Sequence, residues 1–298
     1  MSTQLTSTLK SGDFASVFTE VSHKEKLAGL YNAGELHLYH LAVSSNRFDY
    51  RDLTDFLEDN LDRYVYSRSQ IEQYETQGRI NRIVFDASKL LKSVADRSRL
   101  AGEMLLYIML EHCLKAPKIM SKVELIKSSG DIKSVCDGMH LLGGDSSRAL
   151  SIVFGASEVH ANITDAIDEG FKRICGISQH LDDECRLAET MTLNTPRSIG
   201  EAQQIKALLV PKPNAQPQYE KDYALFLGYD LGLSRNYPNS DYRDQMTQKM
   251  QLDIGHHADY IAKKITDNSL ANHSFYIYFL PFDEVDKDVY EVVKSIFE

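Results

Sequence analysis

The middle of the chain alternates between helix-like and strand-like patterns of apolar residues. Apolar side chains recur at three- and four-residue spacing over residues 86–113, which predicts one long helix, apolar nearly all round in its second half. Three apolar runs bounded by turn residues follow at 119–127, 135–142 and 149–159, and we expect each to be a strand. An apolar stripe from Ile167 to Leu181 then predicts a helix.

The flanking regions show the same mixture, which predicts an α/β protein with a mixed central sheet flanked by helices. Further predicted elements are a strand at 36–41, a helix at 53–61, a short helix at 202–209, a strand at 223–229, a helix at 242–265, a strand at 275–280 that Pro281 ends, and a helix at 289–296. We divide the chain into an N-terminal α/β module (1–90), packed on or continuous with the rest, and a main domain (91–298). A proline-rich connection near 196–217 interrupts the main domain.

Composition narrows the class of protein. The chain is 43% hydrophobic and 26% charged, it has no apolar run long enough for a membrane span, and its N-terminus does not resemble a secretory signal. Its four cysteines form no CxxC pair, and we expect a reducing cytoplasm. The net charge of −10 implies that DNA would repel the isolated chain, so a partner or a local basic patch would have to hold any nucleic acid. Alternatively, the acidity serves only solubility.

Three carboxylates in or beside apolar runs are the candidate chemistry. Glu103 lies in the predicted long helix, Asp137 lies in the second predicted strand directly before Gly138, and Glu158 lies near the end of the third. Carboxylates in apolar surroundings are costly unless they are paired, and three that converge would suit a hard divalent cation. Such a site supports phosphodiester hydrolysis. Each residue also has a structural interpretation: a solvated helix edge, a turn with Gly138, or a solvated strand end.

Strand parity adds one candidate to this set. Residues 152, 154, 156, 158 and 160 share one face of the third predicted strand, so Glu158 and His160 point the same way, about 7 Å apart. Asp137 and His140 have opposite parity, so at most one of them joins the site. We expect Asp137 and Glu158 to bind Mg²⁺ or Mn²⁺, Glu103 to assist, and His160 to act as a base or to stabilise charge.

At these residues the chain resembles the HamA proteins, the effector family of the Hachiman anti-phage defence system. The resemblance implies a PD-(D/E)xK-type nuclease core that acts on DNA with a superfamily-2 helicase, which restrains the nuclease until activation. It also implies that Glu103 is the helix carboxylate and Asp137 the metal-binding aspartate. The matching stretches are 101–107, 116–122, 137–141, 154–158 and 276–282.

The third motif departs from the family pattern Gly-Glu-x-Lys. Without a gap, Ala156 replaces the metal-binding glutamate and Glu158 replaces the lysine. With a two-residue shift, Glu158 is the glutamate and His160 stands in place of the lysine. Neither register restores the lysine, which would orient water and offset phosphate charge, and we consider Lys122 or Lys127 as substitutes.

Three hypotheses therefore stand. The first is a Mg²⁺-dependent DNA nuclease effector in complex with a helicase. The second is a catalytically inactive nuclease fold that serves as a DNA- or helicase-binding regulatory subunit. The third is an unrelated acidic α/β adaptor whose carboxylates are structural.

Overall fold

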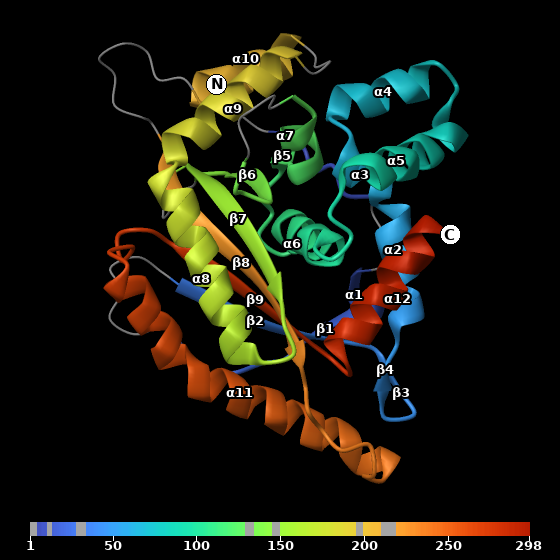
Figure 1. Ribbon diagram of the computed structural model, residues 1–298, viewed down its shortest axis with the longest axis vertical. Helices are drawn as coiled ribbons and strands as arrows, with labels where there is room; N and C mark the ends of the chain where they lie inside the picture. Colours follow the sequence, from blue (N-terminus) through green and yellow to red (C-terminus); the bar gives the residue numbers. More distant parts are fainter. Residues whose placement is uncertain are drawn as a thin grey trace.

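A seven-stranded mixed sheet crosses the molecule, in the order β1-β2-β9-β8-β7-β6-β5 (Figure 1). The computed structural model describes residues 5–10, 14–27, 34–128, 134–144, 150–194, 199–209 and 219–298. The three central pairings, β2 with β9, β9 with β8 and β8 with β7, are parallel, whereas the pairings toward both edges are antiparallel. Helices flank this sheet, so the predicted mixed α/β class is confirmed.

The sheet is built from strands at both ends of the chain and in its middle. The strands are β1 (Phe18–Glu20), β2 (Gly34–Leu41), β5 (Lys118–Ser121), β6 (Gly138–Leu142), β7 (Ser151–Val159), β8 (Glu220–Asp230) and β9 (Phe275–Phe282), with β3 (Val43–Ser44) and β4 (Arg47–Phe48) forming a separate small hairpin. The helices are α1 (Phe14–Val17), α2 (Tyr50–Asp59), α3 (Leu61–Val65), α4 (Arg68–Thr76), α5 (Ile80–Val94), α6 (Leu100–His112), α7 (Lys122–Ser128), α8 (Ile163–Gln179), α9 (Leu181–Asn194), α10 (Ile199–Leu209), α11 (Asn239–Asp267) and α12 (Val285–Phe297).

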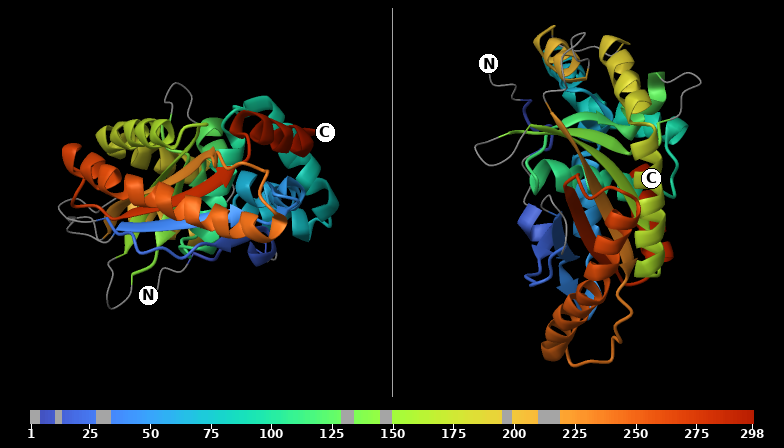
Figure 2. Two further views of the ribbon diagram at one scale, coloured as in Figure 1. Left: turned by 90° about the horizontal axis from the view of Figure 1, so that it is seen from below. Right: turned by 90° about the vertical axis from the view of Figure 1, so that its left-hand side faces the viewer.

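Helices α6 and α8 cover opposite faces of the sheet. A Cβ at Gly155 of β7 would lie 2.7 Å from Leu106 Cδ2 of α6, so this face of β7 is in close contact with α6. A Cβ at Gly170 of α8 would lie 3.2 Å from Leu225 Cδ2, and Leu225 pairs in register with Ala156. Because neighbours in parallel strands share a face, Ala156 faces α8 whereas Gly155 faces α6. Figure 2 shows the two further views in which these layers can be followed.

Several predicted element boundaries were wrong, among them the start of the strand expected at 135–142, which begins at Gly138. The helix expected over 86–113 is two helices, α5 and α6, separated by residues 95–99. The strand expected at 119–127 ends at Ser121, where α7 begins, because Ser121 and Glu124 exchange the reciprocal hydrogen bonds of a capping box. Strand β9 continues through Pro281, which is still in register with Tyr229 of β8, because the pairing with β2 has already ended at Phe279.

The N-terminal ninety residues contribute to the same sheet as the rest of the chain. Strand β2 pairs with β9, and Glu111 of α6 accepts hydrogen bonds from the backbone and hydroxyl of Thr8. The division of the chain at residue 90 stays a prediction. Residues 195–198 and 210–218 of the predicted proline-rich connection lie outside the described residues, and α10 lies between them.

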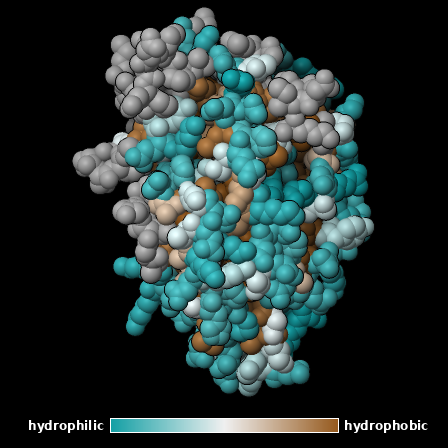
Figure 3. All heavy atoms as spheres, turned by 60° about the vertical axis from the view of Figure 1, so that its left-hand side comes forward, coloured by the Kyte–Doolittle hydropathy of each residue, from teal (hydrophilic) through white to brown (hydrophobic). Residues whose placement is uncertain are grey.

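The face drawn in Figure 3 is predominantly hydrophilic, with hydrophobic side chains visible only in small separate areas. No helix within the described ranges is long and apolar enough to cross a membrane.

A buried lysine joins the N-terminal helices to the edge of the sheet. Lys118 of β5 is 1% exposed, and its Nζ donates to the carbonyl oxygens of Arg63, Tyr64 and Tyr66 at 2.8–3.0 Å, at the end of α3. The same Nζ lies 3.0 Å from Glu124 Oε2. Burial lowers the pKa of Lys118, and the charge of Glu124 opposes this effect.

We expect Lys118→Met to lower the free energy of unfolding by about 3–5 kcal/mol, because it leaves the Glu124 charge and three carbonyl groups without this buried donor. Urea denaturation followed by circular dichroism measures the change. The control is Lys172→Met on α8, where the side chain is 73% exposed and a change within about 0.5 kcal/mol is expected. Equal stabilities of the two variants would contradict this role of Lys118.

Candidate functional site

The candidate site lies where β7 extends past the end of β6. Strand β6 begins at Gly138, opposite Gly155, so the backbone of Ser157 has no strand beside it on the β6 side, although it stays paired with β8 on the other. The carboxylate of Asp137 takes that place, because its Oδ2 accepts the Ser157 N–H at 2.8 Å and the Ser157 hydroxyl at 2.9 Å. The Asp137 side chain therefore continues the hydrogen-bonding pattern of the sheet beyond Gly138, the first residue of β6.

Two arginines from opposite faces of the sheet meet at this strand edge. Arg173 of α8 donates to both carboxylate oxygens of Asp137 and, at 3.0 Å, to the carbonyl oxygen of Ser157. Arg99, which directly precedes α6, donates to the same carbonyl oxygen at 2.8 Å and to Glu158 Oε1 at 3.0 Å. The two guanidinium groups thus compensate two carboxylates and a backbone carbonyl group.

Glu158 and His160 lie on the same side of β7, in agreement with the strand parity. The Nε2 atom of His160 donates to Glu158 Oε2 at 3.0 Å, and Arg173 Nη1 lies 3.6 Å from Glu158 Oε1. Glu158 is 8% exposed, so it does not lie at a solvated strand end. The His160 side chain, at 36% exposure, is the more accessible member of the pair.

Glu103 is a buried carboxylate, not a residue of a solvated helix edge. It is 4% exposed, and its Oε2 accepts a hydrogen bond from the Tyr64 hydroxyl at 3.0 Å. Burial and then the negative charge of Asp137 raise its pKa to about 7, against the opposing charges of Lys122 and Arg99. Glu103 and Asp137 are therefore close enough to influence each other's protonation.

The surroundings of Asp137 shift its pKa in the opposite direction, downward. Burial acts to raise its pKa, but the hydrogen bonds and charge of Arg173 outweigh burial and hold the pKa below its ordinary value. Lys122 and Arg99 act in the same direction as Arg173. Asp137 is therefore a charged group in a fully compensated environment.

Lys122 does not lie on a strand, as the sequence suggested, but begins α7. Its Nζ donates to the carbonyl oxygens of Ser134 and Cys136 at 2.6 and 3.1 Å, so it fixes the segment before Asp137. The side chain of Lys127 lies outside the described part of the structure. His140 is buried away from this edge and donates to the carbonyl oxygen of Ala116 at 2.8 Å.

Ala156, which stands where the family pattern has glutamate, is fully buried on the face of β7 that is covered by α8. It lies one residue before Ser157, and it offers no ligand atom. Arg173 reaches Asp137 from this face of the sheet.

A divalent cation does not fit the donor set as it is arranged here. Among the described residues, no three His, Cys, Asp or Glu side chains are grouped so that they could hold a metal ion. Glu103 and Asp137 have the oxygen atoms that Mg²⁺ prefers, but Arg173 engages both carboxylate oxygens of Asp137. A cation bound there would first have to displace Arg173.

Four contributors to this site were missed by the sequence analysis: Tyr64, Arg99, Ser157 and Arg173. Only Arg173 had a signal that could have identified it. It shares one face of its helix with residues 166, 170 and 177, which are all buried. An arginine within a buried stripe predicts a buried acidic partner. The other three became recognisable only when the strand edge was assembled.

The comparison with protein families gives one match. The family model of HamA matches residues 16–296 of this chain, which includes most of the N-terminal segment as well as the candidate site. No curated protein matches the chain.

The raised pKa of Glu103 predicts a pH-dependent stability difference. Between its ordinary value of 4.5 and about 7, Glu103 holds a proton in the folded state and has lost it in the unfolded state, so its contribution to stability falls as pH rises. Glu103→Gln keeps an acceptor for Tyr64 and removes this titration. We expect the free energy of unfolding of Glu103→Gln, relative to wild type, to increase by about 1–3 kcal/mol between pH 5 and pH 8.

Urea denaturation across this pH range measures the difference, with Glu72→Gln on the exposed surface of α4 as the matched control. Parallel pH profiles for wild type and Glu103→Gln would show that Glu103 does not titrate in this range.

Proposed function

The chain belongs to the HamA family, a membership that indicates a role in anti-phage defence, and on this basis we propose that it is a nuclease effector that cleaves DNA at the edge of β7. The observation that carries this proposal is the presence of two buried carboxylates, Glu103 and Asp137, beside two arginines, with the charge of Asp137 raising the pKa of Glu103. Groups of both kinds can serve phosphodiester hydrolysis, a carboxylate as a base and an arginine to offset phosphate charge.

The residues at the edge have chemistry suited to the separate parts of this reaction. Glu103, with a pKa near 7, would accept a proton from the water that attacks phosphorus. Arg99 has a side chain that is 31% exposed and would offset the charge that builds on the phosphate oxygens. His160 would donate a proton to the leaving oxygen when the bond from phosphorus to that oxygen breaks.

Dependence on Mg²⁺ or Mn²⁺ is part of the proposal, but it concerns a rearranged site. Arg173 occupies the carboxylate of Asp137 in the arrangement described above, so cation binding requires this ion pair to open. We propose that a superfamily-2 helicase is the partner and that it holds most of the DNA. The net charge of −10 supports this, because the chain alone would attract nucleic acid weakly.

A second candidate is a catalytically inactive nuclease fold that regulates the helicase or binds DNA. Two observations favour it: Ala156 cannot act as a ligand, and Arg173 saturates the carboxylate of Asp137. An ion pair of this kind is also a stable structural element, because it satisfies the open edge of β7.

For the nuclease, we expect the wild-type complex with its helicase to cleave linear DNA in Mg²⁺ or Mn²⁺, and Asp137→Asn to reduce the rate by about 100-fold or more. A gel-based time course measures the rate. Asp222→Asn is the matched control, because Asp222 is a buried aspartate of β8 that accepts a hydrogen bond from the backbone of Ser274, at a distant point of the sheet. Full cleavage by Asp137→Asn would remove Asp137 from the reaction.

For the inactive candidate, we expect no cleavage by the wild-type complex with either ion, and the appearance of cleavage when Ala156→Glu and Glu158→Lys restore the family motif. The gain should be at least about tenfold over background. Ala156→Gln with Glu158→Lys is the matched control, because it has nearly the same shape without the new carboxylate. Cleavage by wild type, or by the glutamine control, would contradict this candidate.

A further inference from the structure

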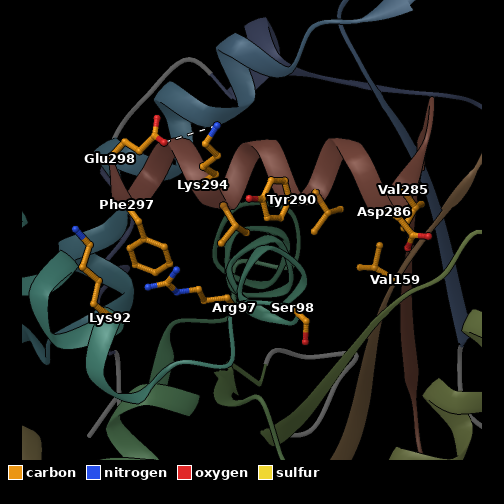
Figure 4. A pocket seen from close by; sticks show the side chains of 12 residues that line it. Lys92, Arg97, Ser98, Val159, Val285, Asp286, Tyr290, Lys294, Phe297 and Glu298 are labelled. Carbon is orange, nitrogen blue, oxygen red and sulfur yellow. Dashed lines mark ion pairs between the residues drawn. The ribbon is translucent and has the colours of Figure 1, made fainter.

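A groove opens beside the candidate site, between α12, the end of α5 and the start of α6. Its volume is about 680 Å³, which is within the range of ligand pockets. Figure 4 shows α12 along one side of this α12 groove, with Tyr290 and Phe297 projecting from the helix and Lys92 and Arg97 near the Phe297 ring. Val159, at the end of β7, lines the opposite end.

The lining combines aromatic rings with three cations, of which Lys294 is paired with Glu298 at 3.7 Å. The Phe297 ring lies 5.1 Å from Arg97 Cζ and 5.9 Å from Lys92 Nζ. Among the residues that the structure describes, neither Lys92 nor Arg97 forms an ion pair, although the chain carries an excess of acidic residues.

Tyr290, a lining residue of the groove, is 63% exposed. The Phe297 ring is itself only 9% exposed, so Tyr290 supplies the exposed ring of the groove. An exposed ring in the same groove as unpaired basic side chains suits a nucleobase joined to a phosphate.

Two short stretches of chain connect the lining of the groove to the candidate site. Val159 directly follows Glu158 on β7. Arg97 and Ser98 line the groove, and the next residue, Arg99, donates to Glu158. A phosphate held at Arg97 would therefore be followed along the same strand by one near Arg99.

We propose that the α12 groove binds a segment of single-stranded DNA and leads it to the edge of β7. The proposal rests on the proposed function, since it names the form of DNA that this site receives. Duplex DNA presents phosphates and sugars outward and keeps its bases stacked, so it cannot use Tyr290 or the valines of α12.

The test is fluorescence anisotropy of a labelled oligothymidylate of about twelve nucleotides with the full chain, at low salt and with EDTA to prevent cleavage. We expect binding at least about tenfold tighter than for a duplex of the same length. Arg97→Glu should weaken single-strand binding about tenfold, whereas the same charge reversal at the exposed Arg186 of α9 should change it about twofold or less. Tyr290→Ala should weaken it about tenfold, and Phe85→Ala, of similar exposure but outside the groove, should not.

Three results would overturn the proposal: equal affinity for duplex and single strand, equal effects of Arg97→Glu and Arg186→Glu, or unchanged DNA affinity with loss of helicase binding in Arg97→Glu. The last result would identify the groove as a protein-docking surface. Failure of the proposed function gives a different pattern. In that case the groove variants lose DNA affinity although neither wild type nor Asp137→Asn cleaves DNA in the helicase complex.

Discussion

The carboxylate of Asp137 is buried just before the first residue of β6, where β7 extends past β6 and is paired only with β8. A charge in this position is tolerated only because Arg173 contacts both of its oxygens and Ser157 donates two further hydrogen bonds. Arg173 comes from α8 on one face of the sheet, and Arg99 reaches the same strand edge from the start of α6 on the other. Asp137, Arg173 and Arg99 therefore connect the sheet to the helices on both of its faces. Asp137 also accepts the Ser157 N–H, which has no partner strand on that side.

Local charge balance decides what this edge can do. The carboxylates of Glu103, Asp137 and Glu158 are matched by the cations of Arg99, Arg173 and Lys122. A cluster compensated in this way attracts a divalent cation less strongly than three bare carboxylates would, and its arginines attract phosphate less strongly than free arginines would. Chemistry at this edge thus requires some of these ion pairs to exchange partners, and a bound partner or substrate could drive that exchange.

Strong local patterns made much of the fold predictable. The apolar run of β7, the amphipathic spacing of α11 and the strand-like alternation of β2 each have one favourable way to bury their apolar side chains, so these elements were found where the sequence placed them. The predicted strand at 119–127 was wrong because polar residues that cap a helix lie within its apolar run. The capping box of Ser121 and Glu124 turned half of an expected strand into α7.

The sequence by itself determined the mixed α/β class and the shared side of Glu158 and His160, because periodicity along a single element fixes which way its side chains point. Only the tertiary structure decided the state of the carboxylates. Whether Asp137 faces a metal ion or an arginine depends on α8, which begins well after Asp137 in the chain. Whether Glu103 holds a proton depends on its burial and on the negative charge of Asp137. Both depend on contacts between different helices and strands, and the spacing of residues within one element does not specify those contacts.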